Sequence, residues 1–169
     1  MNWDPAHYLA YEDFRTRPAV ELLARVPHPE PRSVVDLGCG PGNSTRLLVD
    51  RWPEAEVVGL DTSPEMLDRA RVDLPDVPFE IADARTWTAD QPVDVLFSNA
   101  VLQWIPDHVK LLPRLFDQVA PGGSLAVQVP NNFEHPAHAE GYRIVEESFP
   151  DLGGLLIRRE VHSPAEHFS

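Results

Sequence analysis

A glycine-rich turn, with a carboxylate about twenty residues beyond it, carries the strongest chemical signal in the chain. Residues 34–42 read VVDLGCGPG, and Asp61 closes the next apolar run, VVGLD. An apolar strand entering such a turn, with an acid ending the next strand, is typical of a parallel α/β unit that binds the ribose of an adenosine cofactor. Asp61 would accept hydrogen bonds from both ribose hydroxyls. The alternative is an ordinary strand–helix turn with Asp61 as a helix cap. It is disfavoured because the glycine turn and the acid occur together at the spacing that ribose binding requires.

The spacing of the glycines separates two classes of cofactor. The dinucleotide fingerprint G-x-G-x-x-G would place its third glycine at position 43, which is Asn43, and the last glycine comes one residue early at Gly42. Asp36 precedes the turn, so residues 36–42 complete D-x-G-x-G-x-G. This pattern resembles that of class I S-adenosylmethionine-dependent methyltransferases. The resemblance implies S-adenosylmethionine as cofactor and S-adenosylhomocysteine as product. An oxidoreductase with a nicotinamide cofactor is the alternative, and Asn43 counts against it.

The family resemblance also assigns cofactor contacts. The glycine loop would lie against the methionyl part of the cofactor, and the following helix would direct its N-terminal N–H groups at the cofactor's carboxylate. Asp83 resembles the carboxylate that contacts the adenine amino group, Ala84 would offer its backbone N–H to a ring nitrogen, and Met66 would cover one adenine face. Helix capping or core packing are the alternatives for these three. Asn99 could bond the cofactor through its backbone or reach the substrate, and a turn residue is the alternative. The full set of predicted cofactor contacts is Arg17, Gly38, Cys39, Gly40, Asp61, Met66, Asp83, Ala84 and Asn99.

Composition bounds the class of protein. The 169 residues predict one domain over 1–169, and the single cysteine, Cys39, excludes a disulfide within the chain and favours a reducing cytoplasm. A net charge of −13 argues against a nucleic-acid partner. No apolar stretch approaches the ~20 residues of a membrane span, and the N-terminus lacks a signal-peptide pattern. The sequence shows no sign of an obligate protein partner or of a metal site.

Apolar runs alternating with helical patterns predict a three-layer, Rossmann-like α/β sandwich with a mainly parallel sheet. Met66 is expected on the inner face of its helix. Phe116 is expected among the apolar residues that recur at helical spacing and pack on the core. Class I methyltransferases usually add two strands after the fifth, so the resemblance implies that these C-terminal strands are missing. Residues 1–30 are predicted to form a helical lid. The predicted strands are 33–37, 56–60, 78–81, 93–98 and 124–129, with a turn at 121–123, and the predicted helices are 18–26, 43–51, one opened by Ser63-Pro64, 107–119 and 136–148.

Several further segments narrow the resemblance. NWDPAHYL, RTRPAVELLARVP, SNAVLQWIPDH and LAVQVPNN, together with the glycine motif, resemble the trans-aconitate 2-methyltransferases over most of residues 2–132. The resemblance implies methyl transfer to one carboxylate of trans-aconitate, giving a monomethyl ester. A carboxylate is already ionised near neutral pH, so no catalytic general base is expected. Alignment of the reactants and exclusion of water would provide most of the rate enhancement.

A tri-anionic substrate needs polar or positive anchors. Arg17 could hold either the substrate or the cofactor's carboxylate. Trp3 and Tyr8 could form an aromatic lid, and core packing is the alternative. His108 is predicted to be a surface residue, although it or His135 would be the candidate base for a hydroxyl substrate. A malonyl-thioester carboxyl methyltransferase and a non-catalytic cofactor-binding fragment remain alternatives. The predicted substrate contacts are Tyr8, Arg15, Gln103 and Trp104.

Overall fold

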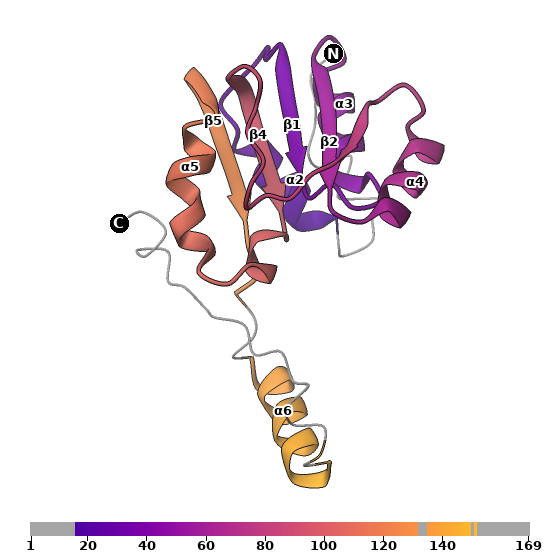
Figure 1. Cartoon of the computed structure of the whole chain (residues 1–169), viewed down its shortest axis with the longest axis vertical. Coiled ribbons are helices and arrows are strands. Elements are labelled where there is room, and N and C mark those ends of the chain that lie inside the picture. Colours follow the sequence, from indigo (N-terminus) through magenta and orange to yellow (C-terminus); the bar gives the residue numbers. More distant parts are fainter. Residues whose placement is uncertain (1–15, 132–134, 150, 152–169) are drawn as a thin grey trace.

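The computed structural model describes residues 16–131, 135–149 and 151. Its centre is a five-stranded sheet in the order β3-β2-β1-β4-β5, and every neighbouring pair is parallel. The predicted parallel α/β architecture is therefore confirmed. All strands end at the lower edge of the sheet in Figure 1. The strands are β1 Ser33–Leu37, β2 Glu56–Asp61, β3 Phe79–Ile81, β4 Val93–Asn99 and β5 Val119–Gln128.

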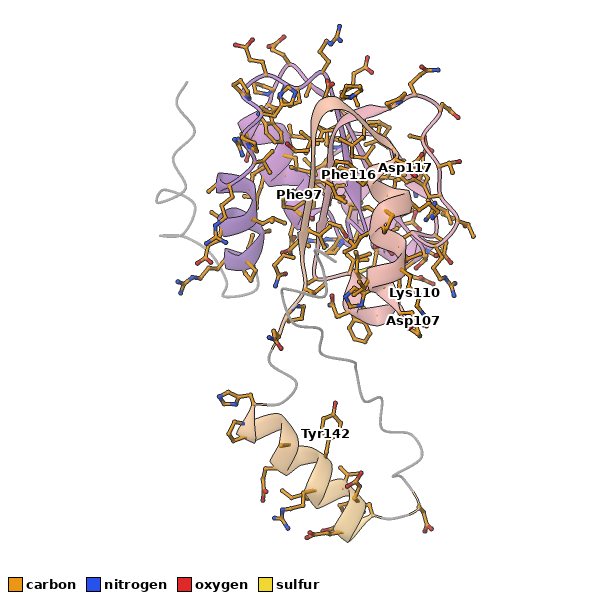
Figure 2. The ribbon with its side chains drawn as sticks, turned by 90° about the vertical axis from the view of Figure 1, so that its left-hand side faces the viewer. Phe97, Asp107, Lys110, Phe116, Asp117 and Tyr142 are labelled. Atoms are coloured by element: carbon orange, nitrogen blue, oxygen red, sulfur yellow. The ribbon has the colours of Figure 1, made fainter. Side chains whose placement is uncertain are left out.

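Helices cover both faces of the sheet (Figure 2). On one face, α2 and α3 pack on β1, β4 and β5 through a core that includes Val20, Leu47 and Phe97. On the other face, a core that includes Leu96 and Leu115 lies beneath α5. These layers place both faces of the strands in apolar surroundings, as continuous apolar strands require. The helices are α2 Arg17–Ala24, α3 Asn43–Arg51, α4 Pro64–Asp73, η1 Leu102–Trp104, η2 His108–Leu111, α5 Leu112–Phe116 and α6 Pro136–Ser148.

The helix predicted over 107–119 is wrong as a single element. Asp107 has a left-handed backbone with φ 55°, which a right-handed helix cannot include, and Pro113 stands in the first turn of α5, where its missing N–H costs nothing. The segment is therefore a 3-10 turn followed by a short α-helix. Two burial predictions made for this segment are also wrong. His108 is buried at 3% exposure instead of lying on the surface, and Phe116 is 61% exposed instead of packing in the core.

Two smaller predictions also need correction. The fifth strand begins at Val119 and includes the predicted turn at 121–123. Val119 pairs with Val93 and Ser124 pairs with Val95, so residues 120–123 form an irregularity in the β4–β5 ladder. Met66 is 46% exposed, so its assignment to the inner face of α4 is wrong. It stands in the first turn of α4, and the buried side of that helix runs through Leu67 and Ala70 instead.

Helix α6 lies below the sheet in Figure 1, apart from the three layers. Among the helices of the described residues, none has the length and apolar character needed to cross a membrane.

Candidate functional site

The glycine loop after β1 is held tightly against the end of β2. The N–H groups of Gly38 and Cys39 both donate to the carbonyl of Leu60, at 2.7 and 2.9 Å. Gly38 has φ +78°, and a Cβ there would stand 2.3 Å from Cγ2 of Val101. The turn after β4 therefore packs against this loop, and a side chain at position 38 would separate them. At Gly40, φ is +54° and an added Cβ would meet nothing within 4 Å, so this part of the loop borders open space.

Asp61 joins the two elements that the sequence predicted to cooperate. Its Oδ2 accepts from Gly40 N at 2.9 Å, and its Oδ1 accepts from Ser63 N at 2.9 Å. These bonds fix the carboxylate between the glycine loop and the start of α4. A carboxylate has about four acceptor positions, so two remain for ribose hydroxyls. The side chain is also partly exposed, as a ligand contact requires.

Asp36 lies beneath the loop and is fully buried. Its Oδ2 accepts from the hydroxyls of Ser44 and Thr45, both at 2.7 Å, which ties β1 to the first turn of α3. Burial raises the pKa of Asp36 from 3.8 to about 6; the two hydroxyls oppose the rise, and the Asp61 carboxylate adds to it. The first residue of the motif is thus a structural brace for the loop.

Cys39 is buried at 3% exposure inside the loop. Burial and the nearby carboxylates of Asp36 and Asp61 raise its pKa strongly. A thiol held protonated in this way is a poor nucleophile. The residue is a small packing element against α4, whose Leu67 and Ala70 share its apolar cluster.

Asp83 follows Ala82, whose N–H donates to the Asp61 carbonyl at 3.0 Å. Its carboxylate is engaged by Arg85 through the Nε and Nη2 atoms, at 2.9 and 2.5 Å from Oδ2. The side-chain bond to Arg85 lowers the pKa of Asp83 to about 2, so it is ionised at neutral pH. Ala84 is buried, and its carbonyl accepts from Arg114. An adenine amino group would share the Asp83 carboxylate with Arg85.

Asn99 ends β4, next to the glycine loop. Ala100 follows with an unusual φ of 56°; its N–H donates to the carbonyl of Gln128 at 2.9 Å, and its own carbonyl accepts from Gln103 Nε2 at 2.6 Å. Trp104 is 60% exposed at the end of η1. The predicted residues that follow strand four therefore lie together at the carboxyl end of the sheet, where ligands of open α/β sheets bind.

The remaining predictions fall on the N-terminal part. Arg17 begins α2 and pairs with Glu21 at 2.8 Å, with its side chain 63% exposed. No described contact connects it to the glycine loop, and its cofactor role stays a prediction. The predictions for Trp3, Tyr8 and Arg15 lie outside the described residues.

Residues 34–123 match the model of a protein family described as a methyltransferase domain. The chain belongs to this family. Trans-aconitate 2-methyltransferase of Methylobacterium radiotolerans is 61% identical over 137 residues, which are 81% of this chain and 53% of that protein. The enzyme of that name from Escherichia coli is 50% identical over 153 residues, covering 90% of this chain and 61% of that protein. The methyltransferase domain thus spans little more than half the length of the curated relatives it matches.

Solved structures agree with the fold. A crystal structure of an S-adenosylmethionine-dependent methyltransferase from Mesorhizobium loti has a TM-score of 0.60 and 31% identity, over 70% of this chain and 55% of that one. The five-stranded sheet with helices on both faces is accordingly the class I methyltransferase fold.

One residue of this edge escaped the sequence analysis. Gln128 ends β5 directly beside Asn99, but it follows the apolar run SLAVQV with no glycine turn or acid to mark it. Only its place at the end of a parallel strand could have drawn attention to it.

Proposed function

We propose that this methyltransferase domain binds S-adenosylmethionine and serves methyl transfer to a carboxylate of trans-aconitate. The observation that carries the proposal is the hydrogen bond from Gly40 N to the Asp61 carboxylate. It joins the glycine loop and the proposed ribose-binding residue in one site. The names of the relatives, at 50 to 61% identity, support the acceptor.

The described residues fit the proposed cofactor. Asp61 offers acceptors for two ribose hydroxyls, Asp83 offers a carboxylate for an amino group, and the open space at Gly40 admits a ligand close to the backbone. Met66, exposed on the first turn of α4, is available to cover the adenine. The loop then leads into α3, whose first N–H groups favour an anion such as the cofactor's carboxylate.

For this reaction the protein mainly has to position the two reactants. The bound cofactor supplies a methyl group whose bond to sulfur breaks as a bond to a carboxylate oxygen forms, leaving S-adenosylhomocysteine and a monomethyl ester. The acceptor is ionised at neutral pH, so no residue needs to remove a proton. The chain's own residues hold both reactants in line and keep water out, which can lower a barrier by several kcal/mol, on the order of 7–11 for ideal alignment.

Calorimetric titration tests the cofactor half of the proposal. S-adenosylmethionine and S-adenosylhomocysteine should bind the purified chain with micromolar affinity, and NADH should not bind. Trans-aconitate and S-adenosylmethionine are then incubated with the chain, and the ester is sought by mass spectrometry. Binding of NADH in place of S-adenosylmethionine would overturn the cofactor assignment. Binding of S-adenosylmethionine, with ester formed from another acid only, would overturn the acceptor alone.

A further inference from the structure

Three amide side chains at one edge of the sheet hold buried oxygen atoms with no hydrogen-bond partner in the part of the chain that the structure describes. They are Asn99 Oδ1, Gln103 Oε1 and Gln128 Oε1. Native proteins leave few buried polar atoms unpaired, because the lost hydration is not replaced. Their gathering at the carboxyl ends of β4 and β5, where this fold binds ligands, indicates that a ligand contacts these amides, either by donating to the oxygens or by accepting from the N–H groups once an amide has turned.

Asn99 and Gln128 form the last rung of the β4–β5 ladder. Two residues earlier the same ladder pairs Phe97 with Ala126, and both of these lie in the core beneath α2 and α3. Because side chains alternate along a strand, the two amides continue this same face. Figure 2 shows Phe97 on the side of the sheet that α2 and α3 cover. Neighbouring strands lie about 4.8 Å apart, so the amides stand side by side where that face ends.

The backbone beside this pair is held in place. Ala100 is one of two non-glycine residues with positive φ in the described ranges, and such strain gathers at functional sites. Its N–H and carbonyl are bonded to the Gln128 carbonyl and the Gln103 amide. Gln103 therefore has its amide committed to the backbone. Within the described residues, the side chains of Asn99 and Gln128 make no hydrogen bond, so each amide can turn about its last bond.

A turned amide presents N–H donors where its oxygen stood. Two neighbouring amides can then donate to the two oxygens of one carboxylate. The geometry points to Asn99 and Gln128 as an amide pair that binds a carboxylate of the methyl acceptor, with Gln128 as a specificity-determining residue. The inference rests on the proposed function, since it concerns the acceptor of that same site.

Binding measurements test the pair without requiring turnover. The chain is saturated with S-adenosylhomocysteine, and trans-aconitate, citrate, tricarballylate and the uncharged trimethyl ester of trans-aconitate are titrated in turn. Gln128→Met, which keeps the length but not the hydrogen bonds, should raise the Kd of the bound acid about 10- to 100-fold. Gln128→Glu should raise it further, by about 100-fold or more, because two carboxylates would meet. The Kd of S-adenosylhomocysteine and the melting temperature should stay unchanged.

Gln91→Glu is the matched control, since it makes the same charge change at an exposed position before β4, at the opposite edge of the sheet. It should leave every Kd unchanged. If trans-aconitate binds equally well to the wild type and to Gln128→Met, the amide pair is refuted while the proposed acceptor stands. If another acid binds instead and depends on Gln128, the pair stands and the proposed acceptor falls. If no acid binds to the saturated chain, or if the trimethyl ester binds as well as the acid, the inference is overturned.

Discussion

The two halves of the site differ in how their polar groups are satisfied. At the ends of β1 and β2, both oxygens of Asp61 accept bonds from backbone N–H groups, and the glycine loop is bonded to the Leu60 carbonyl. At the ends of β4 and β5, the amide oxygens of Asn99 and Gln128 have no partner among the described residues. The glycine loop and the Asp61 carboxylate are held by the fold itself, although Asp36 Oδ1 beneath them is also buried without a partner among the described residues; the amide pair is completed only when a ligand donates or accepts.

This difference separates two kinds of recognition. A cofactor shared by a whole family can be met by a rigid loop whose geometry the backbone fixes in advance, which lowers the cost of ordering on binding. An acceptor is read by side chains that can turn. Mutations in the first half should therefore disturb the fold and cofactor binding together, whereas mutations in the second half should change affinity for the acceptor alone.

The largest effect is expected at Gly38. Gly38→Ala would place a Cβ in a left-handed backbone and within 2.5 Å of both Cγ atoms of Val101. Backbone strain costs about 1–2 kcal/mol and overpacking about 1–3 kcal/mol, so we expect the free energy of unfolding to fall by about 2–5 kcal/mol in urea denaturation. S-adenosylmethionine binding should weaken with it, since the loop and the turn after β4 would be pushed apart.

Gly122→Ala is the control for this substitution. Gly122 has φ +83°, but an added Cβ would meet nothing within 4 Å, so only the backbone strain of about 1–2 kcal/mol applies. The double variant Gly38→Ala/Val101→Ala should recover part of the loss by removing the clash. Equal costs at Gly38 and Gly122 would show that the contact with Val101 has no energetic weight.

The next effect concerns Asp61. Asp61→Ala removes the acceptor of the Gly40 and Ser63 N–H groups together with the proposed ribose contact. We expect S-adenosylmethionine to bind about 2–4 kcal/mol more weakly, roughly 30- to 1000-fold in Kd by calorimetry. Asp61→Asn keeps one acceptor and should lose less. An unchanged affinity of Asp61→Ala for S-adenosylmethionine would refute the assignment of Asp61 to the ribose. The distinction between a cofactor half and an acceptor half of the site would then fail as well.

The same two halves differ in what the sequence could predict. The glycine loop and Asp61 are close in sequence and carry fixed residue types, so their cooperation was predictable. Gln128 is not predictable, because its nearness to Asn99 depends on which strands pair and in what register. The helix predicted over 107–119 failed for local reasons: hydrophobic spacing does not reveal the left-handed backbone of Asp107, the 3-10 turn at 108–111 or the end of α5 at Phe116. His108 is buried at 3% exposure, which hydrophobic spacing also did not reveal.

Asp36, which lies buried beneath the glycine loop, predicts that the stability of the chain depends on pH. The pKa of Asp36 is raised from 3.8 to about 6, mainly by burial, so the folded chain holds this proton more tightly than the unfolded chain. Its contribution to stability is fully present below about pH 4 and is lost as the pH rises through 6. Asp36→Asn removes the charge, and between pH 4 and 8 it should gain up to about 3 kcal/mol in unfolding free energy relative to the wild type.

Thr45→Val sharpens this test, because the Thr45 hydroxyl opposes the rise of the Asp36 pKa. Its removal should move the midpoint of the pH dependence upward, as followed by thermal unfolding across the pH range. A difference between Asp36→Asn and the wild type that stays constant with pH would contradict the assignment. Either result leaves the β4–β5 end unaffected, since Asn99 and Gln128 do not titrate.

The smallest effect is expected at the pair Asp83–Arg85, on the cofactor half of the site. The Arg85 side chain of this ion pair is exposed, so Arg85→Ala should leave the free energy of unfolding almost unchanged. It also leaves the carboxylate available to the adenine amino group, so S-adenosylmethionine affinity should stay within about twofold of the wild type or rise. Asp83→Ala should weaken binding about 3- to 10-fold, the value of one hydrogen bond. Equal losses in the two variants would instead mean that the pair acts as a unit that shapes the loop after β3, and that Asp83 does not contact the cofactor.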